Sequence, residues 1–168
     1  GMKKRLSALL LALLLLLALC ACGLDTPAQP EDGLTVYFLD VGQADSALVV
    51  CGGEAMLIDG GNVADAQYVV SALAQRGVTA LQTVVATHCD EDHCGGLAGV
   101  LAKYPAGRVL CSVTQYDTKA FSDFVKYAAA QDRAIEQPQP GERWELGGAS
   151  VTVLGPLRDY EDNNENSI

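Results

Sequence analysis

The chain has 168 residues, enough for one domain and little more, and its 49% hydrophobic and 19% charged content excludes a disordered chain. It carries 21 Asp and Glu against 11 Lys and Arg, a net charge of −10. A chain this acidic offers no basic surface that would release counterions from phosphates, so no tight nucleic-acid binding is expected from it alone.

Residues 1–21 predict an export signal. Basic residues at positions 3–5 precede an uncharged apolar run at positions 6–19, which is shorter than the ~18 residues of a membrane-spanning helix. The following Leu19-Cys-Ala-Cys22 resembles a bacterial lipobox. This resemblance implies lipidation at Cys22, a lipidated tether over residues 22–33, and an extracytoplasmic protein held at the membrane by its lipid. An ordinary secretory signal cleaved after residue 21 is the alternative.

Residues 34–168 read as one α/β domain. Strands are expected at residues 34–39, 47–51, 55–58, 81–86, 108–111 and 151–154. Helices are expected at residues 64–76, 97–103 and about 121–128, where apolar residues recur at helical spacing. Asp117 or Thr118 is available to cap the third helix. The acidic residues 159–167 are expected to form a loop.

The most informative segment is residues 86–96, which follow a predicted strand and contain both histidines of the chain. Between His88 and His93 lie three carboxylates, those of Asp90, Glu91 and Asp92. On a tight loop these side chains converge on a small volume that suits one or two divalent cations. A solvated acidic turn is the alternative, but two histidines within six residues favour a metal site.

Three motifs resemble a known family. His88-x-Asp90-x-Asp92-His93 resembles the His-x-His-x-Asp-His signature of the metallo-β-lactamase fold, with Asp in place of the second His. The segment 40–46, Asp-Val-Gly-Gln-Ala-Asp-Ser, resembles the Asp-Val-Gly-Gln-Gly-Asp-Ser block of the ComEC-like branch, which includes proteins of competence and DNA uptake. The segment 57–61, Leu-Ile-Asp-Gly-Gly, resembles the conserved aspartate motif of the same fold.

The resemblance implies a role for each of these residues. His88 and Asp90 would bind one metal ion, and Asp92 and His93 would bind a second. Three further aspartates would support these ligands from behind: Asp40, Asp45 and Asp59. Up to two ions, zinc or manganese, would hold a water that attacks an ester or phosphodiester, with Asp92 at the catalytic centre. Asp90 in place of an imidazole should lower the preference for zinc and raise the tolerance for manganese.

The complete fold in this family is an αββα sandwich, and its second half supplies two more histidines and a bridging aspartate. No histidine follows His93, and residues 163–168 resemble the start of the next family strand. The expectation is therefore an N-terminal αβ half, with the second half missing. An exposed sheet edge and an uncovered core face should follow.

Three functions remain open at this point. The resemblance implies an extracytoplasmic metal-dependent hydrolase of phosphodiesters, with DNA as a possible substrate. The alternatives are a non-catalytic module with weak metal binding, and a hydrolase of lactones or β-lactams. Because the later metal ligands are missing, whether the chain is itself an enzyme stays open, as does its oligomeric state.

Cysteines and the single tryptophan complete the sequence expectations. Cys51, Cys89, Cys94 and Cys111 allow three disulfide pairings, and buried free thiols are equally compatible with the sequence. For Cys89 and Cys94, simple burial is favoured over thiolate ligation or a redox-sensitive disulfide. Trp144 is expected to pack in the core or to cover a sheet edge.

Overall fold

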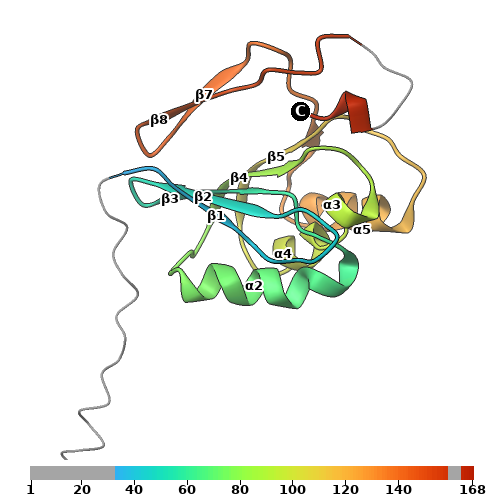
Figure 1. Ribbon diagram of the computed structural model, residues 1–168. Coiled ribbons are helices and arrows are strands. Elements are labelled where there is room, and N and C mark those ends of the chain that lie inside the picture. Colours follow the sequence, from blue (N-terminus) through green and yellow to red (C-terminus); the bar gives the residue numbers. More distant parts are fainter. Residues whose placement is uncertain (1–32, 159–163) are drawn as a thin grey trace, which may run out of the picture.

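The computed structural model describes residues 33–158 and 164–168. A six-stranded sheet with strand order β1–β2–β3–β4–β5–β6 forms its centre, and a separate two-stranded sheet is made by β7 and β8. Helices cover one face of the large sheet and the β7–β8 hairpin lies over the other (Figure 1). Cys22, with the predicted signal and most of the tether, lies outside the described residues. Within them no helix is long and apolar enough to cross a membrane.

The strands and helices follow the predicted order. The strands are β1 (Thr35–Phe38), β2 (Ala47–Cys51), β3 (Glu54–Ile58), β4 (Leu81–Ala86), β5 (Ala106–Cys111), β6 (Ile135–Glu136), β7 (Arg143–Leu146) and β8 (Ala149–Thr152). The helices are α2 (Ala66–Gln75), α3 (Glu91–Cys94), α4 (Leu97–Leu101) and α5 (Lys119–Ala129), with 3-10 turns at Val63–Asp65 and Asn164–Asn166. Helix α3 and strands β6 and β7 were not predicted, because elements of two to four residues are too short to show a period.

The sheet is antiparallel at one side and parallel at the other. Strands β1, β2 and β3 form an antiparallel meander, whereas β3, β4, β5 and β6 run parallel. Parallel neighbours need crossover connections, which α2, α3 with α4, and α5 provide on one face. The carboxyl ends of β3, β4 and β5 therefore meet at the same edge of the sheet. In open α/β sheets this edge is where ligands bind.

The main core lies between the large sheet and its helices. Fully buried residues from successive strands face this layer: Leu48, Leu57, Val84 and Val109. Helix α2 contributes Val69 and Leu73, and α5 contributes Phe124. Of the two predicted caps for α5, the structure uses Thr118, whose hydroxyl accepts from the Phe121 backbone N–H at 3.2 Å.

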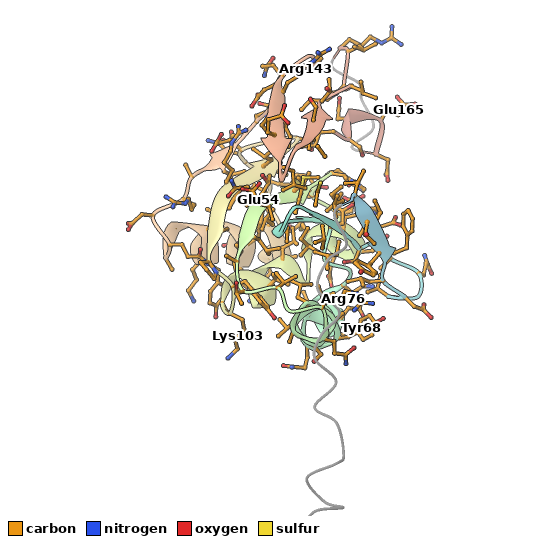
Figure 2. All side chains as sticks on the ribbon, turned by 90° about the vertical axis from the view of Figure 1, so that its left-hand side faces the viewer. Glu54, Tyr68, Arg76, Lys103, Arg143 and Glu165 are labelled. Carbon is orange, nitrogen blue, oxygen red and sulfur yellow. The ribbon has the colours of Figure 1, made fainter. Side chains whose placement is uncertain are left out.

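A second, smaller core lies on the opposite face of the sheet, under the β7–β8 hairpin. Buried Met56, Val85 and Leu110 of the sheet cluster with buried Leu146 and with partly buried Trp144, so the tryptophan packs as expected. Figure 2 shows this two-sided arrangement from the side, with Arg143 of the hairpin and Lys103 of the helical layer at opposite ends of the molecule.

The tip of the hairpin is fixed to the meander. The Glu54 carboxylate at the start of β3 accepts from the Gly147 N–H at 2.8 Å, and the Cys51 thiol donates to the Gly147 carbonyl at 3.3 Å. At the β1 edge of the large sheet the apolar side chains of Leu34, Val36 and Phe38 are exposed to solvent, and the exposed fraction of Phe38 is 86%. An exposed sheet edge was expected, and β1 is an edge strand of the large sheet.

Candidate metal centre

Asp59, the residue after β3, organises the edge where the parallel strands end. Its side chain is buried, and its Oδ1 accepts from the Thr87 backbone N–H at 2.8 Å. Its Oδ2 accepts from the Thr87 hydroxyl at 2.7 Å and lies 2.9 Å from His93 Nδ1. One carboxylate thus holds both the beginning of the loop after β4 and the imidazole at the end of that loop. This is the supporting place that the motif resemblance implied for Asp59.

The contact with Asp59 sets the state of the His93 ring. A carboxylate accepts hydrogen bonds and cannot donate them, so Nδ1 carries a proton, and in the neutral ring Nε2 then keeps a free lone pair. That nitrogen lies 3.6 Å from Asp45 Oδ2 and 4.0 Å from Asp92 Oδ2. The free lone pair of His93 therefore points toward two carboxylates.

One ring nitrogen of His88 is buried and has no hydrogen-bond partner among the described residues. The ring is only 3% exposed, and its Nδ1 lies 3.2 Å from the Thr87 hydroxyl and 3.3 Å from the Ser167 hydroxyl. Its Nε2 is buried without a hydrogen-bond partner and lies 3.5 Å from Asp90 Oδ2. An unpartnered buried polar atom costs about 1–3 kcal/mol, a cost that a bound cation would remove.

The spacing of these donor atoms fits divalent cations. Two ligands about 2.1 Å from one tetrahedral ion lie about 3.4 Å apart, close to the 3.5 Å of the His88–Asp90 pair and the 3.6 Å of the His93–Asp45 pair. The two imidazole rings adjoin, with centroids 3.9 Å apart. The fit is to pairs of ligands: among the described residues, no group of three His, Cys, Asp or Glu side chains is placed to hold an ion.

The position of Asp45 differs from the prediction. It was expected behind the ligands, yet its mostly exposed carboxylate lies in front of His93 Nε2. Its backbone N–H donates to the Asp92 carbonyl at 3.1 Å, which fixes the segment before β2 against the loop after β4. Asp40, also predicted to support the ligands, is exposed, and its Oδ1 accepts from the Gly42 N–H at 3.4 Å. The proposed role of Asp40 stays a prediction.

Two residues that the sequence analysis did not single out touch the predicted ligands. The Tyr116 hydroxyl donates to Asp90 Oδ1 at 3.2 Å, and burial together with this hydrogen bond raises the pKa of Tyr116, so the phenol stays a donor. Ser167 contacts His88, as described above. These residues lie 26 and 79 positions from their partners, which is too far for any local pattern to reveal them.

An open cavity of about 470 Å³ adjoins both histidines, but neither Asp90 nor Asp92 is among the residues that line it. It is lined by Phe38, Asp45, Ser46, Ala47, Ile58, Asp59, Thr87, His88, His93, Asn164 and Ser167. Its polar wall holds both histidines, and the highly exposed Phe38 forms part of an apolar wall.

Glycines let the loop after β3 approach the start of α4. The Gly60 N–H donates to the His93 carbonyl at 2.7 Å, and the Gly96 N–H donates to the Gly61 carbonyl at 3.0 Å. A Cβ on Gly96 would overlap the Gly60 carbonyl. The close approach of these two backbones therefore requires glycine.

Gly96→Ala is expected to separate the two loops, to lower the free energy of unfolding by about 1–3 kcal/mol, and to weaken metal binding. Chemical denaturation and manganese titration would measure both effects. Gly33→Ala is the matched control, because its Cβ would meet nothing within 4 Å. Equal stability of the two variants would show that the contact between Gly60 and Gly96 is not required.

The cysteines near the loop face the core instead of the cavity. Cys89, Cys94 and Cys111 are fully buried in the helical core, and all four described cysteines are free thiols. Burial raises the pKa of Cys94 to about 12, and its thiol donates to the Cys89 carbonyl at 3.2 Å. Buried packing of Cys89 and Cys94 was the favoured expectation, and the structure agrees with it.

The fold and the loop define a class: an α/β protein with a His- and Asp-rich loop at the carboxyl edge of its parallel strands. The family model of the metallo-beta-lactamase superfamily matches residues 39–160. The chain belongs to the metallo-beta-lactamase superfamily, as the three motifs predicted. Proteins of this superfamily use divalent metals, usually zinc.

Relatives and solved structures agree with this assignment. The chain is 30% identical over 144 residues to competence protein ComA of Neisseria gonorrhoeae, covering 84% of this chain and 18% of that protein. A metallo-beta-lactamase of Cronobacter sakazakii with an HARLDQ motif superposes with a TM-score of 0.51 at 21% identity, over 77% of this chain and 54% of that one. The metallo-beta-lactamase SMB-1 bound to 2-mercaptoethanesulfonate superposes with a TM-score of 0.54 at 20% identity, over 74% of this chain and 53% of that one.

The chain therefore corresponds to a small part of the competence protein and to about half of each of these lactamases. The predicted fold class is confirmed in this form: an α/β arrangement that matches part of the lactamase fold. At these identities the lactamase structures show the fold alone.

Proposed function

We propose that this chain carries the metal-binding loop of an extracytoplasmic hydrolase directed at phosphodiesters. The observation that carries the proposal is the pairing of His88 Nε2 with Asp90 at 3.5 Å and of His93 Nε2 with Asp45 at 3.6 Å, separations that suit shared cations. Asp92 lies 4.0 Å from His93 Nε2. The likeness to a competence protein favours a phosphodiester over a lactam substrate.

Each residue has a definite task in this proposal. His88 and Asp90 would hold one divalent ion, and His93 and Asp92 the other, with Asp45 as an additional ligand. When bound, such ions supply an acidified water for attack on the ester. Asp92, beside His93 in the loop, is the residue that we assign to the catalytic centre. Asp59 keeps His93 Nδ1 protonated, so that Nε2 faces the metal.

The donor set also bears on the metal. Three carboxylates and two imidazoles make an oxygen-rich site. Oxygen ligands suit manganese, whereas zinc is typically bound by sulfur and nitrogen ligands. Because the chain is acidic, we expect a phosphodiester to be held at the ions and not by a basic surface.

Turnover of bis-p-nitrophenyl phosphate and of nitrocefin, each with manganese and with zinc, tests the proposal. We expect little or no turnover from this chain, phosphodiester turnover from a full-length homologue that an Asn at the position of Asp92 abolishes, and no nitrocefin turnover from either. Nitrocefin turnover without phosphodiester turnover would contradict the proposal. Because this chain matches only part of its relatives, the same assay belongs on a full-length homologue as well.

A second candidate is a non-catalytic metal-binding module. It is favoured by the absence, among the described residues, of any three side chains placed to hold one ion. Saturable manganese binding with no turnover of either compound, in this chain and in the full-length homologue, would indicate this function.

We also propose that Cys22 is lipidated and anchors the protein outside the cytoplasmic membrane. Cys22→Ser should block lipid attachment and either release the protein into the medium or stop processing of the signal, whereas Cys20→Ser should do neither. Fractionation and metabolic labelling with a fatty acid would measure this. A Cys22→Ser protein that is processed normally and stays in the membrane would contradict lipidation at this residue.

A further inference from the structure

A buried thiol of the loop after β4 faces a second buried thiol at the end of β5. Cys89 lies between His88 and Asp90, and Cys111 is the last residue of β5. Their sulfur atoms are 3.4 Å apart, and both side chains are fully buried. The parallel register that sets Ala86 opposite Cys111 explains the approach, because Cys89 follows β4 by only three residues.

We propose that Cys89 and Cys111 form an oxidation site, at which a small-molecule disulfide converts the two thiols into a disulfide bond that ties the metal loop to β5. The site is separate from the cavity, and its formation does not depend on the proposed hydrolase function. Its consequence does concern that function, because the two residues that flank Cys89 are both predicted metal ligands.

The geometry requires little movement. A disulfide has a sulfur–sulfur distance of about 2.05 Å, so the two sulfur atoms must approach by about 1.4 Å. Cys89 belongs to a loop and Cys111 to the end of a strand, so the loop can supply most of this shift. Because both thiols are fully buried, the loop must open locally to admit the small-molecule disulfide, while the sheet keeps its register.

The other described cysteines are poorer partners. The Cys94 thiol donates to the Cys89 carbonyl oxygen at 3.2 Å, so its described contact is with the backbone and not with sulfur. The Cys51 thiol donates to the Gly147 carbonyl and is held at the hairpin tip. Of the six possible pairs among these four cysteines, the structure thus brings together Cys89 and Cys111.

The small-molecule disulfide is the oxidant, and it accepts the two electrons that the cysteines lose. One cysteine thiolate attacks the small-molecule disulfide and forms a mixed disulfide, releasing one small thiol. The second cysteine thiolate attacks the protein sulfur of the mixed disulfide, forms the Cys89–Cys111 bond and expels a second small thiol. Two electrons pass from the protein to the oxidant, and the two cysteine protons end on the two small thiols.

The full chain, incubated with oxidised glutathione and digested without reduction, tests the proposal. Trypsin separates Cys89 from Cys111 by cleaving after Lys103 and Arg108, and a Glu-specific protease separates Cys89 from Cys94 by cleaving after Glu91. We expect mass spectrometry to find a Cys89–Cys111 linked peptide in most chains. We also expect the melting temperature of the oxidised protein to rise by about 5 °C or more, because the bond closes a loop in the unfolded chain.

Matched variants identify the pair. Cys94→Ser and Cys51→Ser should retain both the linked peptide and the rise in melting temperature, and Cys111→Ser should lose both. If Cys111→Ser does not fold, the map of the wild-type linked peptide decides the question. The proposal is overturned if the wild type links Cys89 to Cys94, or if Cys89 and Cys111 stay reduced under conditions that oxidise the unfolded chain.

Discussion

Replacing Asp59 with Asn is expected to weaken manganese binding by about 10- to 100-fold while the protein keeps its fold. The Asn carbonyl can still accept from the Thr87 N–H, which lies 2.8 Å from Asp59 Oδ1. The amide nitrogen then takes the place of Oδ2 and donates to His93 Nδ1. That ring nitrogen must become an acceptor, so the proton moves to Nε2, the atom that faces Asp45 and Asp92.

Loss of the charge also weakens the hydrogen bonds of this buried group, so we expect the free energy of unfolding to fall by about 1–2 kcal/mol. Asp123→Asn is the matched control, because it makes the same chemical change in an ion pair with Lys119 on the surface of α5. Isothermal titration with manganese measures the affinity. Wild-type affinity in Asp59→Asn would show that Asp59 does not prepare His93 for a metal ion.

Replacing His88 with Phe is expected to remove binding at the first ligand pair, with an affinity loss above about 100-fold. The new ring has a similar shape, but it lacks the buried Nε2 that faces Asp90. The metal-free variant should be about as stable as the wild type. The unpartnered nitrogen is gone, which offsets the loss of the His88 Nδ1 contacts to Thr87 and Ser167.

Thermal unfolding with and without manganese separates these two effects. A ligand at 100 times its dissociation constant stabilises the folded state by about 2.7 kcal/mol, and His88→Phe should lose the part of this gain that comes from its site. Tyr68→Phe, at an exposed position of α2, controls for an aromatic substitution. An unchanged shift of the melting temperature with manganese in His88→Phe would place the metal elsewhere.

The parts of the fold that could be predicted are those encoded locally. The strands around Leu48, Leu57 and Val84 carry continuous apolar runs, and the apolar positions of α2 and α5 recur at helical spacing. The candidate ligands could be listed for the same reason, because His88, Asp90, Asp92 and His93 lie on one short loop. The supporting role of Asp59 could be predicted from its motif after β3.

What the sequence could not reveal depends on contacts between distant segments. Asp45 was predicted to support the ligands from behind, whereas its place in front of His93 depends on the contact of the segment before β2 with the loop after β4. Tyr116 follows β5, and Ser167 belongs to a segment 79 residues from His88. The choice of Cys111 as the neighbour of Cys89 likewise depends on the register of β4 with β5.

The central claim is that the loop after β4 binds divalent cations through two adjoining His–Asp pairs. Isothermal titration of the protein with manganese, in the wild type and in the Asp90→Asn/Asp92→Asn double variant, tests it most directly. We predict saturable binding in the wild type that the double variant loses, while circular dichroism shows the same fold in both. No saturable binding in the wild type, or the same isotherm in both proteins, would contradict the claim.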